Sequence, residues 1–496
     1  MKKQIMILVL IISSVFLLVG CSSKNIYTYI LDDSYKEYLV MGTSADYPPY
    51  ESPKKVNGKM ELVGIDIELA KEIAKAAGKN LKIVNKDFDF LLDDLVNNKV
   101  DFVISGMNPS PERELIVDFS DVYYEATHSV IINNKSKDKF NSVEDLNNNK
   151  IKVGAQLGSI QQEIVEADMN QSNTVFLKNV TDLIMQLKDD KLDAVILETP
   201  VASSFIKNNK DLSLLNFTVG TGEDGTAVAV SEGNVELLNL INYVINNLID
   251  TGKMEQIIND AILGDEIVEK SFPFSFIFNI DYVKILLQGL LMTIVLALLS
   301  VTLGSLIGLF VALGRIVDNK FINTISKGYV EIIRGTPLLV QVLLIYSLFK
   351  LPVILVLGID LSSFIPGVIA LLINSSAYVS EIIRGGINSI DTGQKEAALS
   401  LGFNDKQVMR KIILPQAVKN IIPSLGNEFV TMIKETSIFM YLGVAELMYA
   451  ASIVKVQTYQ IKEVYIVTAL LYLVLTLSTS KLMTMYERKL GLKDEK

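Results

Sequence analysis

The chain has 496 residues, of which 50% are hydrophobic, and it carries a formal net charge of −10. Its mean hydropathy of +0.35 exceeds that of an ordinary soluble protein, so part of the chain is expected to lie in lipid. The negative charge argues against nucleic-acid binding, which needs a clustered basic surface. A single Cys and a single His exclude a disulfide, a zinc cluster of these residues and a Cys/His nucleophile pair.

The first 21 residues have the pattern of an export signal. Two lysines follow the initial Met, an apolar stretch runs from Ile5 to Val19, and Leu18-Val19-Gly20-Cys21 ends it. These last four residues resemble a lipobox, the motif in which the cysteine is lipidated and becomes the new N-terminus. An uncleaved anchor helix is the alternative. Either interpretation places the next domain outside the membrane.

Residues 35–265 are predicted to form a soluble α/β domain with two lobes and parallel sheets. Short apolar runs typical of strands alternate with stretches of helical periodicity such as Ile65 to Ala77. Ligand sites in parallel sheets lie at the carboxyl ends of the strands. The predicted strands are Leu39–Met41, Leu81–Val84, Val100–Ile104 and Ala194–Leu197.

Four separated segments together resemble the extracellular solute-binding proteins for polar amino acids, and the first two of them directly follow predicted strands. The resemblance covers roughly residues 38–263. It implies a ligand cleft lined by residues at matching positions in all four segments. The segments are Gly42–Tyr50, Ser105–Ser120, Val153–Ser159 and Asp193–Pro200.

An amino-acid zwitterion needs a cation for its carboxylate and an anion for its ammonium group. Arg113 is predicted to bind the carboxylate, because its planar fork matches two oxygens, and Glu198 is predicted to bind the ammonium group. Taken singly, Arg113 also fits a surface residue and Glu198 an acid at a helix start. The resemblance adds Tyr47 and Phe88 as aromatic faces, although each also fits a turn or the core. It further adds, as cleft residues, Ser44, Gly106, Asn108, Ser159 and Ile160.

The side-chain preference of the site depends on Ser44. Relatives that bind basic amino acids have an aspartate there, whereas this chain has Asp46 two residues later. A buried hydroxyl suits an amide better than a cation, although a carboxylate elsewhere in the cleft would compensate. The sequence thus favours glutamine-like side chains and leaves arginine and lysine open.

Residues 266–282 are predicted to be a linker, and residues 283–490 a membrane domain with about five transmembrane helices. Basic residues after the first, third and last spans fall on one side if the spans alternate, which makes that side cytoplasmic. The binding domain then lies outside the cell. The predicted spans are Ile285–Leu313, 328–349, 361–380, 421–446 and 463–480.

Three motifs in this part resemble importer permeases of the ATP-binding cassette (ABC) class for polar amino acids. Arg334–Gln341 opens the second span and Ser376–Ile387 closes the third. Between the third and fourth spans stand Glu396-Ala397-Ala398, Gly402 and Leu414-Pro415, at the spacing of the family's cytoplasmic EAA loop. The resemblance implies that Glu396, Ala397, Ala398 and Gly402 form a short helix docked on an ATPase subunit.

The sequence has no Gly-x-x-x-x-Gly-Lys-[Ser/Thr] phosphate loop, so ATP hydrolysis is expected in a separate partner chain rather than in this one. We therefore interpret the chain as a fused solute-binding and permease subunit of an amino-acid ABC importer, without cofactor or metal, that works as a homodimer in membrane lipid. The alternatives are a membrane-anchored amino-acid sensor, a ligand-gated channel and an enzyme on the same two-lobed fold. The sensor is the strongest of them, but it has no use for an EAA loop.

Overall fold

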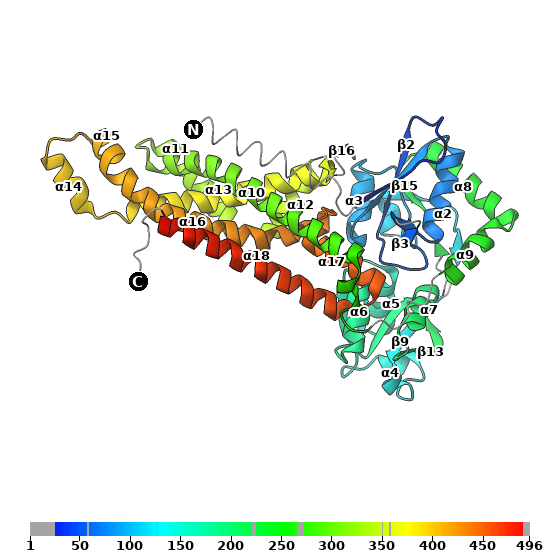
Figure 1. The fold of residues 1–496 in the computed structure, drawn as a ribbon. Helices are drawn as coiled ribbons and strands as arrows, with labels where there is room; N and C mark the ends of the chain where they lie inside the picture. The colour runs from blue at the N-terminus through cyan, green and yellow to red at the C-terminus, as the bar shows by residue number, and fades with distance from the viewer. Residues whose placement is uncertain are drawn as a thin grey trace.

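The structure is a computed structural model that describes residues 25–56, 59–125, 127–220, 225–264, 272–349, 351–356 and 359–489. The expected signal, including the lipidation candidate Cys21, lies outside these residues. Figure 1 shows a two-lobed α/β domain at one end of an elongated helical bundle. The predicted fold class is confirmed.

The first lobe is built on a six-stranded sheet of order β1-β5-β2-β6-β15-β7. Apolar residues of α2 fill one side of this sheet, because its buried positions recur with the helical period. The strands are β1 (Ile26–Tyr29), β2 (Tyr38–Thr43), β5 (Asn80–Asn85), β6 (Phe102–Val103), β7 (Val117–Phe119) and β15 (Ala229–Ser231). Its helices are α2 (Ile65–Ala76), α3 (Leu91–Val96), α8 (Val235–Asp250) and α9 (Lys253–Gly264), and a hairpin is formed by β3 (Ser52–Val56) and β4 (Lys59–Val63).

The second lobe is built on a five-stranded sheet of order β11-β10-β12-β9-β13. Its strands are β9 (His128–Asn133), β10 (Lys152–Gln156), β11 (Asn173–Leu177), β12 (Ala194–Glu198) and β13 (Leu212–Val219). Its helices are α4 (Val143–Leu146), α5 (Ile160–Asp168), α6 (Val180–Lys188) and α7 (Thr199–Asn208). The chain crosses between the lobes at β8 (Tyr124–Glu125) and β14 (Gly225–Thr226), which pair with each other.

The four predicted strands and the predicted helix are present, but the expectation of parallel sheets is only half right. The central strands β5, β2 and β6 are parallel, as are β11, β10 and β12. The other pairs are antiparallel: β1 with β5 and β15 with β6 and β7 in the first sheet, and β9 with β12 and β13 in the second. Strands β15 and β9 belong to segments that return from the other lobe or enter it. Apolar patterning alone does not distinguish these directions.

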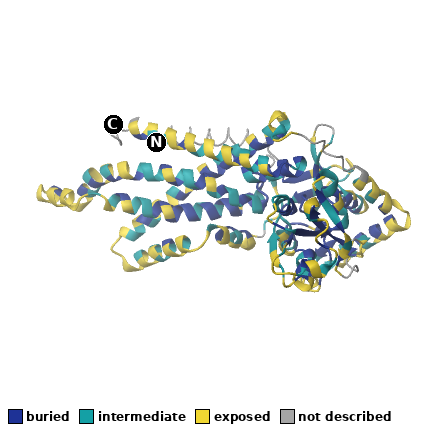
Figure 2. Cartoon of the chain, turned by 90° about the horizontal axis from the view of Figure 1, so that it is seen from below, coloured by how far each residue is buried: buried dark blue, intermediate teal, exposed yellow. Residues whose placement is uncertain are grey.

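Among the described residues, the bundle contains three helices that are long and apolar enough to span a membrane. The number of spans rises to as many as five if each of two bent pairs of helices is counted as one span. The three are α10 (Ile280–Ile316), α13 (Leu361–Asn388) and α18 (Ile461–Lys489). Figure 2 shows buried residues inside the binding domain and along the inner faces of the bundle. The remaining bundle helices are α11 (Lys320–Gly335), α12 (Leu338–Leu348), α14 (Thr392–Ser400), α15 (Asp405–Val408), α16 (Leu414–Glu435) and α17 (Leu447–Thr458). Short elements are η1 (Phe88–Phe90), η2 (Arg113–Leu115), η3 (Asn134–Ser136), η4 (Ser275–Phe278), η5 (Met409–Ile413), η6 (Thr436–Leu442), β16 (Leu355–Val356) and β17 (Ile359–Asp360).

The expected second span, 328–349, is not one helix. Helices α11 and α12 meet at an angle of 107°. Thr336 is extended, as residues before a proline prefer, and Pro337 cannot donate a helical hydrogen bond. The amide of Gln341 donates to the carbonyl oxygens of Ile333 and Thr336, at 2.6 and 3.0 Å, and so satisfies the end of α11.

Two other expected boundaries also shift. Helix α10 begins at Ile280, inside the segment expected to be linker. The fourth apolar segment ends as a 3₁₀ turn at Leu442, and α17 then runs at 53° to the preceding helices. This bend places α17 beside the binding domain in Figure 1.

Candidate functional site

A small pocket lies between the two lobes. Its empty volume is about 210 Å³, and both lobes contribute to its lining. The carboxyl ends of β6 and β10 lead directly into it, which is where ligand sites of parallel strands are expected. The lining residues are Tyr47, Phe88, Ser105, Gly106, Asn108 and Arg113 from the first lobe and Gln156, Ser159, Ile160 and Gln161 from the second.

Seven of the nine residues predicted to bind substrate line this pocket: Tyr47, Phe88, Gly106, Asn108, Arg113, Ser159 and Ile160. They come from four separate stretches of the chain, so the fold brings together residues that the sequence keeps far apart. Their role as ligand contacts stays a prediction. Sequence reasoning did not single out Ser105, Gln156 and Gln161, although all three stand in or beside the quoted segments.

Arg113 supplies the positive charge of the pocket. Its side chain is 8% exposed, and its guanidinium donates to the carbonyl oxygens of Asn108 in the first lobe and Gly158 in the second, the latter at 2.6 Å. Burial lowers the pKa of Arg113 from its ordinary value. The pocket thus contains a buried cation, which suits an anionic group of a ligand.

Aromatic rings form a wall of the pocket. The Phe88 ring lies 5.7 Å from the guanidinium carbon of Arg113, and Tyr47 stacks on Tyr50 with 5.8 Å between ring centres. Gly106 adopts a positive φ of 52°, and a Cβ there would stand 3.0 Å from the Tyr47 ring. Glycine is therefore required both by the backbone and by the close approach of the ring.

A buried carboxyl pair supports the loop that carries Gly106. Asp66 accepts hydrogen bonds from the Gly106 N–H and the Tyr123 hydroxyl, both at 2.7 Å, and Glu51 accepts one from Ser105 at 2.7 Å. Burial, and then the neighbouring Asp66, raise the pKa of Glu51 well above its ordinary value. The pair therefore holds a proton at neutral pH, since two adjacent buried carboxylates cannot both ionise. Sequence reasoning missed this pair because Glu and Asp are usually surface residues.

Ser44 and Glu198 do not line the pocket of Arg113. Glu198 is fully buried at the end of β12, where it pairs in register with His128. Its charge contributes, after burial, to raising the pKa of Tyr50 well above the ordinary value. Whether Glu198 binds an ammonium group thus stays a prediction.

Ser44 lies in a second pocket, at the contact between the binding domain and the bundle. This pocket has an empty volume of about 420 Å³, and it includes Asp46, Asp87 and Tyr449. Asp46 is 7% exposed, and only one of its carboxylate oxygens has a hydrogen-bond partner among the described residues, the Ser44 hydroxyl at 3.2 Å. Burial raises the pKa of Asp46 to about 6 and that of Asp87 to about 7.

The residues predicted to couple to an ATPase lie at the end of the bundle that is far from the binding domain. Glu396, Ala397 and Ala398 are in helix α14, which Figure 1 places at the end of the bundle away from the binding domain. Ala398 is buried, and Gly402 ends the turn after α14 with a φ of 85° and no atom within 4 Å of an added Cβ. Gly402 is thus favoured by its backbone conformation rather than by space.

Metal binding finds no support in the described part of the chain. No group of three or more His, Cys, Asp and Glu side chains there could hold a metal ion.

Comparison with protein families gives two matches that divide the chain. Residues 39–262 match the bacterial extracellular solute-binding proteins, family 3. Residues 304–492 match the inner membrane component of binding-protein-dependent transport systems. The two matches correspond to the two-lobed domain and to most of the helical bundle.

Individual relatives resemble each part separately. The arginine-binding extracellular protein ArtP of Bacillus subtilis is 36% identical over 269 residues, covering 54% of this chain and 100% of ArtP. The putative glutamine transport system permease protein GlnP of Rickettsia felis is 41% identical over 211 residues, covering 42% of this chain and 95% of GlnP. A crystal structure of the amino acid ABC transporter substrate-binding protein AbpA of Streptococcus pneumoniae, bound to L-arginine, has 36% identity and a TM-score of 0.44, covering 46% of this chain and 96% of AbpA.

The first prediction from this site concerns the buried cation. We expect Arg113→Met to weaken amino-acid binding by well over tenfold, since loss of one partner of a buried charge pair costs about 2–5 kcal/mol. Calorimetric titration of the purified full chain measures the affinity. Lys135→Met, which removes an exposed lysine of the same domain, serves as the control. Near-normal affinity in a folded Arg113→Met protein would contradict the assigned ligand pose.

The second prediction concerns pH. Because the folded protein holds the pKa of Asp46 near 6, above that of an unfolded aspartate, the folded state binds the proton more tightly. The resulting stability is present below about pH 4 and is lost as the pH rises through about 6. We expect Asp46→Asn to melt at a higher temperature than the wild type at pH 7 and to lose this advantage at pH 4. The exposed Asp33→Asn is the control, and equal melting curves at both pH values would contradict the prediction.

Proposed function

The chain belongs to the family 3 extracellular solute-binding proteins through its first part and to the inner membrane components of binding-protein-dependent transport systems through its second, and from this premise we propose that it is the polar-amino-acid-binding and membrane-spanning subunit of an ABC importer. The two-lobed domain binds the amino acid outside the membrane. The bundle then forms the path through which the amino acid enters the cell.

One observation carries this proposal: the binding domain rests directly on the end of the bundle, and both of its lobes contact permease residues. The Asn85 amide of the first lobe donates to the Tyr449 hydroxyl at 3.1 Å. Lys455 of α17 donates to Asp182 of the second lobe at 2.8 Å. A ligand released from the cleft therefore has the permease as its immediate neighbour.

The chemistry of the cleft supports an amino acid as the ligand. Arg113 offers a buried cation to the carboxylate, and the rings of Tyr47 and Phe88 offer apolar surface to the aliphatic part. Within the proposal, Glu198 takes the ammonium group and Ser44 contacts the end of the side chain, which requires the ligand to reach beyond the pocket of Arg113. Arginine and glutamine relatives both match the chain, so L-arginine and L-glutamine are the two substrates to test.

ATP hydrolysis is assigned to a separate ATPase subunit that docks on α14. The distance of α14 from the binding domain in Figure 1 supports a cytoplasmic place for α14 and an extracytoplasmic place for the lobes. One permease half per chain favours a homodimeric pore, with the exposed apolar side chains of the bundle in membrane lipid. We also retain the proposal that Cys21 is lipidated. Neither matched family description supports the sensor alternative.

The experiment that tests the binding half of the proposal is a calorimetric titration of the full chain in detergent. We expect L-glutamine or L-arginine to bind with one site per chain, and we expect Arg113→Met to abolish the signal. Absence of binding by all polar amino acids would overturn the proposed substrate class.

The coupling half of the proposal predicts that binding and transport can be separated. We expect Glu396→Lys and Gly402→Asp to leave amino-acid affinity unchanged but to abolish uptake and substrate-stimulated ATP hydrolysis in proteoliposomes that contain the ATPase partner. Glu396→Lys reverses a charge on the docking helix, and Gly402→Asp places a side chain where φ is 85°.

Gly252→Asp is a matched control for the backbone strain that an aspartate causes at a positive φ. Gly252 also has a positive φ, of 68°, and open space around it, but it lies in the binding domain. We expect this variant to transport normally. Wild-type coupled ATPase activity in both Glu396→Lys and Gly402→Asp would refute the assignment of α14 as the coupling helix.

A further inference from the structure

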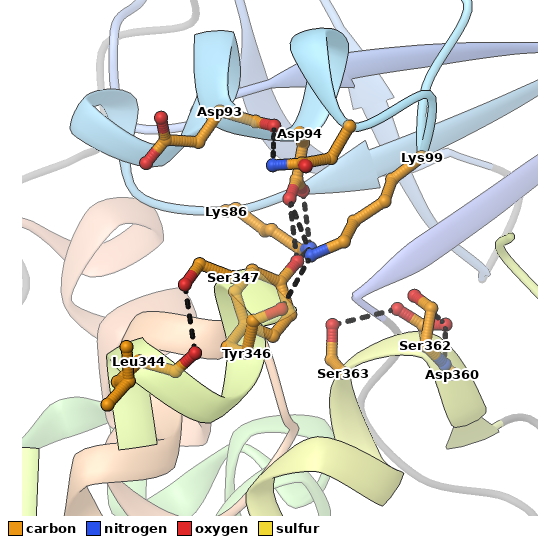
Figure 3. Close-up of polar contacts among 11 residues, drawn as sticks. Lys86, Asp93, Asp94, Lys99, Leu344, Tyr346, Ser347, Asp360, Ser362 and Ser363 are labelled. Carbon is orange, nitrogen blue, oxygen red and sulfur yellow. Dashed lines mark hydrogen bonds and ion pairs between the residues drawn. The ribbon is translucent and has the colours of Figure 1, made fainter. Parts of the chain in front are cut away.

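The first lobe meets helix α12 through a cluster of buried charges, which Figure 3 shows. Lys86, Asp94 and Lys99 come from the binding domain, and Tyr346 comes from α12. The side chains of Lys86 and Lys99 are each 1% exposed and that of Asp94 is 2% exposed. These side chains belong to the binding domain, and they are buried where it contacts the permease.

Tyr346 contacts every member of this cluster. Its hydroxyl donates to the Asp94 carboxylate at 2.6 Å and accepts a hydrogen bond from the Lys86 ammonium group. The Lys99 ammonium nitrogen lies 3.1 Å from the centre of the Tyr346 ring, and it also donates to the Tyr346 carbonyl oxygen at 3.4 Å. The ring and hydroxyl of one permease residue thus cover both lysines.

The charges of the first lobe do not balance without the permease. Lys86 pairs with Asp94, and Lys99 stands 3.5 Å from the same carboxylate, so two cations share one anion. The permease offers Asp360, the buried N-cap of α13, whose negative charge favours the charged form of both lysines. In Figure 3 the Asp360 carboxylate accepts hydrogen bonds from the Ser362 and Ser363 hydroxyls at the start of α13.

The titration of the lysines agrees with this geometry. Asp94 is the largest of the charges that raise the pKa of Lys86, against the effect of burial. For Lys99 burial prevails and lowers the pKa to about 8. Lys99 is therefore the less well compensated cation, and it is the one that lies against the Tyr346 ring face.

We propose that Tyr346 and Asp360 form a docking site on the permease for the cationic edge of the first lobe, made by Lys86 and Lys99, and that Tyr346 is a positioning residue for transport. The inference rests on the proposed function, because it gives the contact a role in delivering the amino acid. Its occupant is the lobe of the same chain.

Contacts elsewhere along the interface support this choice of occupant. The amide of Gln457 in α17 donates to the Pro53 carbonyl oxygen at 3.2 Å, and Lys55 pairs with Asp281 of α10. The charged cluster is thus continuous with other contacts between this binding domain and this bundle. The binding domain of a second copy would need to displace all of them.

The energetics favour a contact that orients the first lobe on the permease and can be released, rather than one that holds the lobe there permanently. Removing charges from water cancels much of the attraction that they gain on pairing. A misplaced lobe, however, would bury Lys99 without its partners, and this penalty excludes other orientations. Charge burial therefore selects one orientation at little gain in affinity, as a cycle of docking and release requires.

The docking site is also well placed to act on the permease. Tyr346 lies near one end of α12, and the other end is the break at Thr336 and Pro337. Gln341 in the same helix accepts a hydrogen bond from Asn374 of α13 at 3.1 Å. A shift of α12 that followed the lobe would therefore reach α11 and α13.

The test measures docking directly. Spin labels are placed at the exposed positions Leu115 in the first lobe and Ile280 at the start of α10, in a Cys21→Ser background. We expect one narrow distance distribution in the wild type and a broad, longer one in Tyr346→Leu. Tyr346→Phe keeps the ring but loses the hydroxyl, so we expect an intermediate result. Lys82→Met, which removes a lysine that lies over Tyr38 within the lobe, is the matched control.

Function is measured on the same variants in proteoliposomes with the ATPase partner, using L-glutamine and L-arginine. We expect Tyr346→Leu and Lys99→Met to reduce uptake at least tenfold without changing the calorimetric affinity. Asp360→Asn, which retains a helix cap, should reduce uptake as well. In the double variant Asp360→Asn/Lys99→Met, we expect the fold-reduction in uptake to be smaller than the product of the two single fold-reductions, because neither charge is then left without the other.

The outcomes distinguish this inference from the proposed function. If the wild type takes up neither amino acid, the proposed function fails. If the wild type transports and Tyr346→Leu keeps both the narrow distance distribution and wild-type uptake, the docking site is refuted. Lost uptake with an unchanged distance would also refute docking, since Tyr346 would then act only within the bundle. Multiplicative effects in Asp360→Asn combined with Lys99→Met would remove Asp360 from the site.

Discussion

Compensation of buried charge between separate parts of the chain is the constraint on which this structure depends. Arg113 in the cleft donates to carbonyl oxygens of both lobes, and Lys86 and Lys99 meet the permease at Tyr346. A buried charge is costly unless its partners are held in place. Each such group therefore fixes the relative position of the two parts that it joins, and together these groups set how the lobes sit on the bundle.

The broad architecture follows from local sequence patterns. Strands such as β2, β5 and β12 are short apolar runs, and α10 and α13 are long apolar helices, so periodicity and length predict them. Seven cleft residues were predictable because they lie in or beside segments that resemble a known family, or, for Phe88, at a position where that family has an aromatic ring. The broken second span was not predicted, because hydropathy reports apolar length and not direction. Thr336 and Pro337 carried the signal, in the rule that residues before proline avoid the helical conformation.

Contacts between distant segments cannot be predicted from local sequence patterns. Lys86, Asp94 and Lys99 have the pattern of an ordinary solvated surface, and no local feature links them to a tyrosine some 250 residues later. Glu51 and Asp66 likewise resemble surface acids, although they form a fully buried pair under the cleft. Such groups are recognisable only once the fold excludes water from them, since burial gives them their energy and their altered pKa.

The placement of the two pockets suggests how cleft and permease are related. The pocket of Arg113 lies between the lobes, whereas that of Ser44 and Asp46 is lined by both lobes and by α17. Tyr47 follows Asp46 directly in the chain, so the loop after β2 contributes to both. A change in the position of this loop would alter both the pocket in the cleft and the pocket at the permease. The covalent link between neighbouring residues is thus the shortest physical connection between binding a ligand and contacting the membrane domain.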